Sequence, residues 1–196
     1  MALAVYSHEV PSFHRVAYAP VMSYMHGSLF VAGDGWAHEA FNGGSVAVWN
    51  KVVVVGLQYR LGVFGFLALE EFKVEDVSTG NYGMMDQRAA LRWVDLDGHS
   101  FGGNPARSIV WGGWADGAVS SCYHIMSPAS QGWVSGAILQ STGCTFNKHR
   151  AELAEAASVV GLLLPYFHDK CDAAETVDSG QVACLRGLPV RDLVRM

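Results

Sequence analysis

The sequence predicts an α/β fold in which a partial, mostly parallel central sheet carries helices on both faces. Short apolar runs with the composition of buried strands alternate along the chain with segments of helical periodicity, which is typical of parallel sheets with covered faces. At 196 residues, 51% of them hydrophobic, the chain is also long enough to bury a sizeable core in one domain.

Four segments are predicted to form strands. Residues 21–25 and 52–57 are apolar runs rich in β-branched or aromatic side chains, and each is followed by glycine or turn residues. Residues 108–111 and 136–139 have the same character. Because both faces of a parallel strand are covered, such runs need not alternate with polar residues.

Two of the predicted helices are defined by their apolar faces. The first runs over about residues 83–96, and its face is formed by Met85, Ala89 and Trp93. The other ends at Pro165, which cannot continue a helix. Its face is formed by Leu153, Ala157, Val160 and Leu164.

The composition argues against several classes of partner. The net charge is −5 and no basic cluster is present, so nucleic acid and anionic lipid surfaces are not expected partners. No apolar stretch approaches the ~20 residues that a membrane span requires. The amino-terminal residues lack the charged and apolar regions of a signal peptide. The sequence also implies no cofactor.

The four cysteines form no CxxC pair and have no regularly spaced histidine partner, which argues against a metal site. Cys171 and Cys184 bracket a short polar stretch, and a disulfide closing it would stabilise the fold by roughly 3 kcal/mol. On spacing alone, two unpaired thiols are an equal alternative. The pairing of Cys122 and Cys144 is left open.

Trp114 lies where the strand at 108–111 breaks into glycines and another predicted helix begins, at residues 117–126. In α/β-hydrolases this junction is the nucleophile elbow, a strained GxSxG turn that projects a serine hydroxyl from the sheet edge. Trp114 stands at the serine position. Its indole offers one N–H donor and no group that a base could convert into a nucleophile.

Asp116 follows Trp114 by two positions, where a small residue normally lets helix and strand approach closely. An aspartate there argues against a tight turn. Its carboxylate is instead expected to cap the helix at 117–126 by accepting from the first free N–H groups.

Ser100 lies in a second candidate elbow, because Gly98-His99-Ser100-Phe101-Gly102 matches GxSxG letter for letter. This segment follows the helix at 83–96 and precedes the strand at 108–111, whereas an elbow requires a strand followed by a helix. We therefore expect a glycine-rich turn here. Ser100 as the nucleophile is the less favoured alternative.

The segment His26-Gly27-Ser28-Leu29 follows the strand at 21–25, where a hydrolase keeps the loop whose backbone N–H groups bind the oxyanion. Its amides could therefore point at a developing negative charge. Alternatively, the loop is only a tight turn, because Ser28 and Leu29 restrict the φ values that glycines would allow.

Several long and unusual runs cover nearly the whole chain: PVMSYMHG (20–27), VVVV (52–55), YRLGVFGFL (59–67), GNYGMMDQ (80–87), ALRWV (90–94), FGGNP (101–105) and AILQS (137–141). In these runs the chain resembles the type B carboxylesterases, which are α/β-hydrolases and include the cholinesterases. The resemblance implies that fold and, as the family's chemistry, hydrolysis of carboxylic esters.

The resemblance also assigns roles to two segments. The family's Gly-Glu-Ser-Ala-Gly falls on residues 112–116, and its His-Gly-Gly-Gly falls on residues 26–29. Trp114 therefore occupies the nucleophile position, and Gly27, Ser28 and Ala115 occupy oxyanion-hole positions. Relative to the family motif, the chain has glycine for glutamate at 113, tryptophan for serine at 114 and aspartate for glycine at 116. Each change needs only one nucleotide substitution, which is consistent with a decayed site.

By the same resemblance, residues 1–196 correspond to the amino-terminal and central part of a single domain. The family's catalytic acid and histidine lie in a carboxyl-terminal part that this chain is expected to lack. The histidines of this chain outside the segment at 26–29 have no elbow serine to serve, so they are expected to be ordinary surface or loop residues. Similar family members have a disulfide at the positions of Cys171 and Cys184. That pairing implies an oxidising, secreted or extracellular location.

Three functions remain to be separated. The leading hypothesis is a carboxylesterase-like domain that is not catalytic as written. The second is a binding or adhesion module with an extracellular protein partner, since the neuroligins and the cholinesterase-like domain of thyroglobulin resemble this pattern and lack the serine. The third is an active esterase that attacks small carboxylic esters through Ser100.

Overall fold

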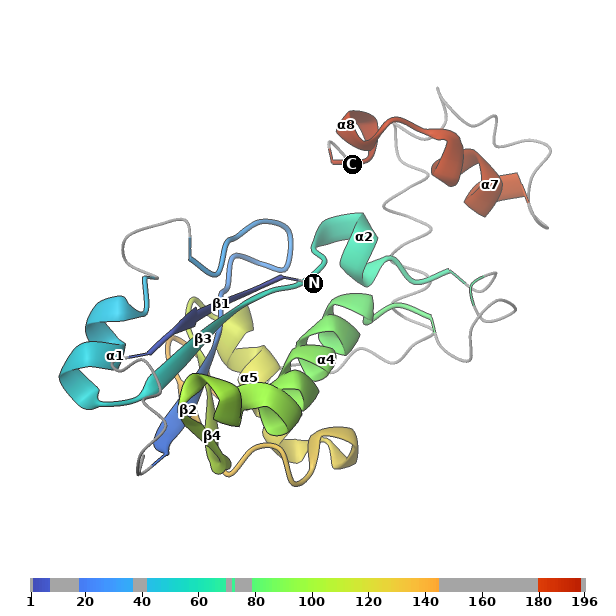
Figure 1. Ribbon diagram of the computed structural model, residues 1–196. Coiled ribbons are helices and arrows are strands. Elements are labelled where there is room, and N and C mark those ends of the chain that lie inside the picture. The colour runs from blue at the N-terminus through green and yellow to red at the C-terminus, as the bar shows by residue number, and fades with distance from the viewer. Residues whose placement is uncertain are drawn as a thin grey trace. The chain divides into compact units, whose positions relative to one another are not determined.

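In a computed structural model of the protein, a five-stranded sheet of order β1-β3-β2-β4-β5 forms the centre of the larger of two units (Figure 1). Residues 1–60 and 83–146 make up this unit, and residues 61–82 and 147–196 make up the other. The structure describes residues 2–7, 18–36, 42–69, 72, 79–144 and 180–194. The expected single domain stays a prediction.

Four of the strands confirm the predicted ones. They are β2 (Ala19–Met25), β3 (Val53–Gln58), β4 (Gly103–Gly112) and β5 (Gly136–Leu139), and they pair in parallel. The fifth, β1 (Ala2–Tyr6), was not predicted and pairs antiparallel with β3 at one edge. The sheet is therefore mixed and mostly parallel.

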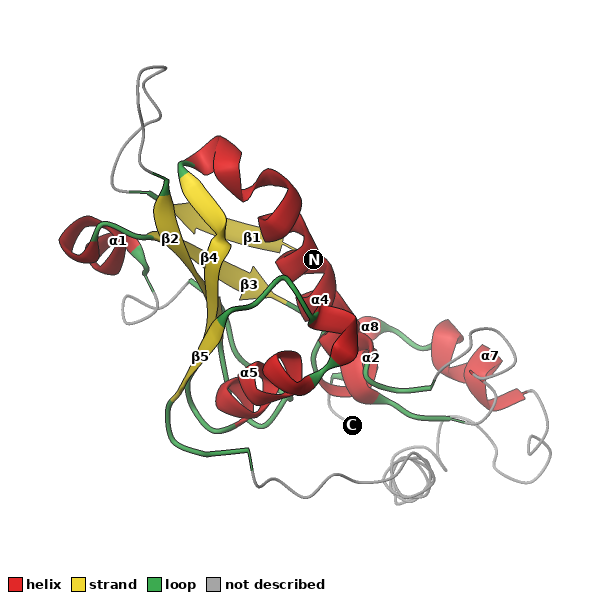
Figure 2. Cartoon of the chain, turned by 90° about the horizontal axis from the view of Figure 1, so that it is seen from below, coloured by secondary structure: helices red, strands yellow, loops and turns green. Residues whose placement is uncertain are grey.

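Helices cover both faces of the sheet. Figure 2 shows α1 (Gly44–Asn50) on one side and α4 (Tyr82–Asp97) and α5 (Asp116–Met126) on the other. Helices α4 and α5 confirm two predicted helices. The predicted helix that ends at Pro165 lies outside the described residues.

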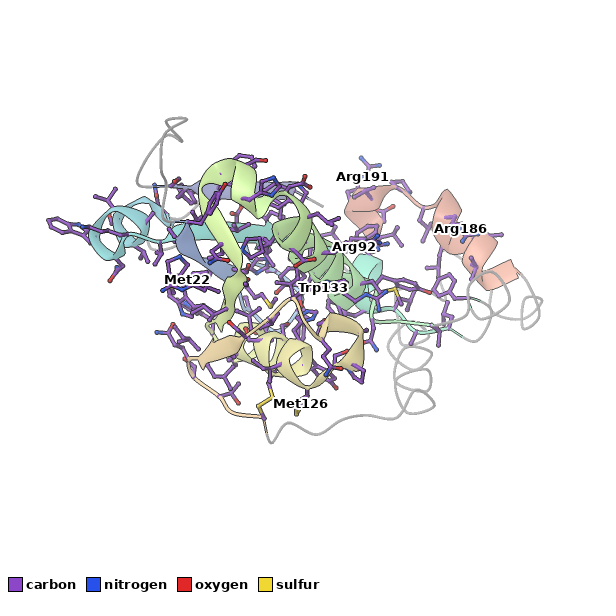
Figure 3. All side chains as sticks on the ribbon, turned by 60° about the horizontal axis from the view of Figure 1, so that its bottom comes forward. Met22, Arg92, Met126, Trp133, Arg186 and Arg191 are labelled. Carbon is purple, nitrogen blue, oxygen red and sulfur yellow. A yellow bond between two sulfur atoms is a disulfide. The ribbon has the colours of Figure 1, made fainter. Side chains whose placement is uncertain are left out.

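Alternation along the strands separates two cores. On the α4 side, the inward residues Val21, Val53, Val55, Leu57 and Val110 pack with Ala90, Leu91 and Val94. On the α1 side, Met22 and Val54 pack with Ala47. Figure 3 shows the labelled Met22 on its strand. Each fully buried aliphatic side chain contributes about 1.5–3 kcal/mol, so both faces stabilise the sheet.

The face predicted for α4 was wrong. Its buried residues are Gly83, Gln87, Ala90, Leu91 and Val94. Ala89 is exposed, and Met85 and Trp93 are half-buried. The buried face differs from the predicted apolar face because it includes a polar residue, Gln87. Gln87 Nε2 donates to Ser120 Oγ at 3.1 Å, and Gln87 Oε1 lies 3.1 Å from His124 Nε2, so the amide is satisfied inside the core.

A disulfide joins Cys122 in α5 to Cys144, which follows β5, and so settles the pairing that the sequence left open. Figure 3 shows it as a yellow bond near the labelled Met126. The cysteines are 22 positions apart, and a crosslink over this length contributes about 3 kcal/mol in the chain-entropy model. It fixes the edge strand β5 to the helix that packs against it.

The smaller unit contains α2 (Gly62–Phe66), α7 (Gly180–Gly187) and α8 (Val190–Leu193). Leu69, Val182 and Leu185 form its core. Cys184 is disulfide-bonded. Because Cys171 lies outside the described residues, the Cys171–Cys184 pairing stays a prediction. Within the described segments, none of the helices is both long and apolar enough to cross a membrane.

The expectation that the other histidines are surface or loop residues was wrong for His124, which is buried within α5 and links this helix to α4 and to the segment after α5. His124 Nδ1 lies 2.9 Å from Ser130 Oγ, and His124 and Ser130 are only 4% and 1% exposed. A serine and a histidine in contact could suggest a nucleophile and its base, but this pair is closed to substrate. Burial, together with the nearby Arg88 charge, lowers the pKa of His124 to about 4.

This pKa predicts acid sensitivity. Because the folded-state pKa lies below the ordinary value of 6.5, the unfolded chain binds the proton first, so stability is complete above pH 6.5 and is lost as the pH falls towards 4. At pH 5 the loss should be about 2 kcal/mol. Urea unfolding between pH 7 and pH 4.5 should show this slope, and His124→Gln should reduce it. An undiminished slope in His124→Gln would contradict the assignment.

Candidate functional site

The candidate site lies where the carboxyl ends of β2 and β4 meet. Met25, the last residue of β2, pairs with Gly112, the last residue of β4, so the loops that follow the two strands are neighbours. From β2 the chain continues to β3 on one side, and from β4 it continues to β5 on the other. Open α/β sheets bind ligands at such a switch point.

The strand-to-helix turn at Trp114 is tight, contrary to the expectation from Asp116. Trp114 has φ 57° and Ala115 has φ 63°, and both are left-handed. The Asp116 N–H donates to the Trp114 carbonyl at 2.9 Å, which closes a γ-turn at Ala115. A strained strand-to-helix turn is therefore present, and Trp114 lies in it.

Three glycines allow this turn by close backbone approach. A Cβ on Gly27 would collide with the carbonyl oxygen of Trp114, and one on Gly112 would collide with the carbonyl oxygen of Gly117. A Cβ on Gly117 would in turn meet the carbonyl oxygen of Met25. Because these glycines supply the space, the residue at 116 does not have to be small.

The loop after β2 keeps a glycine-like backbone without the glycines. Ser28, Leu29 and Phe30 have φ values of 129°, 60° and 58°. Each left-handed residue with a side chain costs about 1–2 kcal/mol. Gly27 lies against the elbow carbonyls, so the structure brings together the predicted oxyanion-hole positions Gly27, Ser28 and Ala115. Ser28 and Leu29 were expected to restrict the φ values of the loop. They nevertheless adopt positive φ values, so the loop is strained.

Asp116 stabilises this strained loop. Its Oδ1 accepts from the N–H groups of Ser28 (2.8 Å) and Leu29 (2.9 Å), and its Oδ2 accepts from the N–H of Phe30 (2.8 Å). The expected capping of α5 was wrong: Asp116 is the first residue of that helix, which has no side-chain cap. The sequence signal that could have predicted this contact is the combination of an acidic residue at 116 with non-glycine residues at 28 and 29.

Trp114 lies beside a pocket of about 140 Å³ on the α1 side of the sheet. Its side chain is 65% exposed. Tyr24 and Trp111 form one wall with ring centroids 4.8 Å apart, and Trp111 Nε1 donates to Gln140 Oε1 at 2.8 Å. Burial raises the pKa of Tyr24 to about 12, so its hydroxyl stays protonated. The pocket offers aromatic surface and neutral polar groups.

His26 lies fully buried beneath the loop. Its ring stacks on Tyr59 at 4.4 Å, and the Tyr59 hydroxyl donates to the His26 carbonyl at 2.6 Å. Neither ring nitrogen has a hydrogen-bond partner within the described residues. Burial lowers the pKa of His26, so the neutral ring acts as packing under the loop.

Ser100 lies far from this site. It is exposed on the 3-10 helix Gly98–Phe101, which connects α4 to the start of β4, as the segment order predicted. Trp114 follows the other end of β4, and a ten-residue strand is about 30 Å long. In the described part of the chain, no group of three or more His, Cys, Asp or Glu residues could hold a metal ion.

Comparisons with known proteins agree on one family. A model described as "Carboxylesterase family" matches residues 1–196. Acylcarnitine hydrolase from Mus musculus is 38% identical over 176 residues, which cover 89% of this chain and 28% of that protein. Neuroligin-2 from Homo sapiens is 36% identical over 177 residues, which cover 89% of this chain and 19% of that protein.

A solved structure supports the fold. The carboxylesterase of Geobacillus stearothermophilus has a TM-score of 0.82 and 31% identity, over 98% of this chain and 38% of its own. The predicted α/β-hydrolase fold is therefore confirmed. The chain spans less than a third of the length of the curated relatives it matches.

The strain in the loop gives a test of stability. Leu29→Gly should raise the free energy of unfolding by up to about 1 kcal/mol, because glycine adopts φ 60° freely while it adds some entropy to the unfolded chain. The lost side chain is 79% exposed and contributes little packing. Val31→Gly is the matched control, since Val31 is exposed in the same loop and has no positive φ, so it should lose stability. Equal losses in both variants would refute the strain.

Proposed function

Because the chain belongs to the carboxylesterase family, we propose that it is a member without ester hydrolysis at its elbow. The observation that carries this proposal is Trp114, which stands between β4 and α5 with φ 57°. The indole nitrogen is a donor only and cannot attack a carbonyl carbon. A covalent acyl-enzyme step has no nucleophile at this position.

Asp116 is a second obstacle to catalysis. Of the three predicted oxyanion-hole positions Gly27, Ser28 and Ala115, the amide of Ser28 already donates to Asp116. Loss of one oxyanion donor typically reduces kcat by about 10²–10³. A nucleophile restored at position 114 would thus attack a carbonyl that lacks one of its predicted oxyanion donors.

A second function is favoured by the exposure of the same residue. A large aromatic side chain that is 65% exposed beside an aromatic pocket is suited to contact a partner. Similarity to neuroligin-2 supports a non-catalytic binding module with a protein partner. The Cys122–Cys144 disulfide supports an oxidising compartment, consistent with a secreted or extracellular location.

The first test is turnover of short-chain p-nitrophenyl esters by the 196-residue chain. We expect no rate above background for the wild type, which has no nucleophile at position 114, or for Trp114→Ser, in which the Ser28 amide stays bound to Asp116. Ser100→Ala is the control: if Ser100 were the nucleophile, a fluorophosphonate probe would label the wild type but not this variant. A rate that saturates with substrate in the wild type would overturn the proposal.

The binding function has its own test. Immobilised wild-type chain should retain a specific protein from an extracellular extract, and Trp114→Ala should weaken retention by tenfold or more, as is usual for a central aromatic contact. Trp49→Ala, which removes an exposed tryptophan on α1 remote from the elbow in sequence, should retain the same protein. Equal retention by all three proteins would exclude Trp114 from the interface.

A further inference from the structure

Three successive backbone amides converge on both oxygens of one carboxylate at the carboxyl end of the sheet. We propose that residues 28–30 form a carboxylate-binding site, and that Asp116 is its internal ligand and closes it to external anions. The proposal of this site depends only on the hydrogen bonds between Asp116 and the amides of residues 28–30. Only its consequence for esters, that their carbonyl oxygen is excluded, rests on the proposed function.

The contacts define the class of ligand. Two amides share Oδ1 and the third binds Oδ2, at 2.8–2.9 Å, which suits a planar anion with two oxygens. Hydrogen bonds to an ionised acceptor are about twice as strong as neutral ones. Successive N–H groups that point into one concavity are a known form of anion site. A small carboxylate such as formate or acetate has the required shape and charge.

The strained loop at residues 28–30 depends on the Asp116 carboxylate for its stability. Ser28, Leu29 and Phe30 all have positive φ, a conformation that is unfavourable for residues with side chains. Without an acceptor, their amides would gain nothing from this arrangement. The carboxylate that compensates the strain is 4% exposed and lies beside the elbow, so an external anion can enter only if the side chain at 116 is removed.

Exchange of the amide hydrogens in the wild-type chain tests the internal ligand. The amides of Ser28 and Leu29 belong to exposed residues, yet they should exchange about 100-fold more slowly than in an unstructured peptide, because they are hydrogen-bonded. In Asp116→Asn the acceptor is neutral and one of its two ends is a donor. Protection should then fall by about tenfold. Fast exchange in the wild type would overturn the proposal.

Chemical rescue tests the ligand class. In Asp116→Ala, sodium formate should raise the Tm and restore the protection of residues 28–30, whereas sodium chloride at the same ionic strength should not. Asp34→Ala is the matched control, since Asp34 also accepts from a backbone amide, that of Trp36 at 2.7 Å. Formate should stabilise neither this variant nor the wild type beyond the effect of chloride. Equal effects on all three proteins would refute a specific site.

The two proposals fail separately. If Asp116→Ala does not fold, exchange in the wild type and in Asp116→Asn still decides the internal ligand. Ester turnover by the wild-type chain would overturn the proposed function and leave the exchange result unchanged. Fast exchange at residues 28–30 would overturn the carboxylate site without restoring a nucleophile at position 114.

Discussion

The close backbone approach between the ends of β2 and β4 is the constraint on which the site depends. Gly27, Gly112 and Gly117 each leave no room for a Cβ, because carbonyl oxygens of the neighbouring segment occupy that space. Any side chain there would separate the loop after β2 from the elbow and shift α5 away from the sheet. The register of Met25 with Gly112 and the position of α5 therefore follow from three missing side chains.

Since the backbone is fixed by these glycines, side chains at other positions of the site can change without altering its path. Trp114, Ser28 and Leu29 all have positive φ, which is unfavourable for residues with side chains. The large parallel core on the α4 face supplies the stability that such strain consumes. The site thus keeps a tight strand-to-helix turn although Trp114, Ser28 and Leu29 carry side chains that such backbone conformations disfavour.

Sequence reasoning succeeded where burial alone decides structure. Continuous apolar runs identified β2 to β5, and the predicted order of elements correctly placed Ser100 between a helix and a strand and Trp114 between a strand and a helix. It failed where a polar group is satisfied by a distant partner. The buried face of α4 was missed because Gln87 is paired with residues of α5, more than 30 positions away. The role of Asp116 was missed because its carboxylate could either cap its own helix or bind amides elsewhere in the chain. The amides that it binds are 86–88 positions away, and the sequence does not show that they are near.

The changes at the loop and at the elbow are physically coupled. Serine and leucine at positions 28 and 29 add strain of about 1–2 kcal/mol each, and domains have only about 5–15 kcal/mol of net stability. Hydrogen bonds to a charged group contribute about 1.5–3 kcal/mol each, so three of them with Asp116 can balance this strain. A glycine at 116 would leave the loop unsupported, and glycines at 28 and 29 would make the carboxylate unnecessary. Serine and leucine at positions 28 and 29 and aspartate at 116 therefore depend on one another.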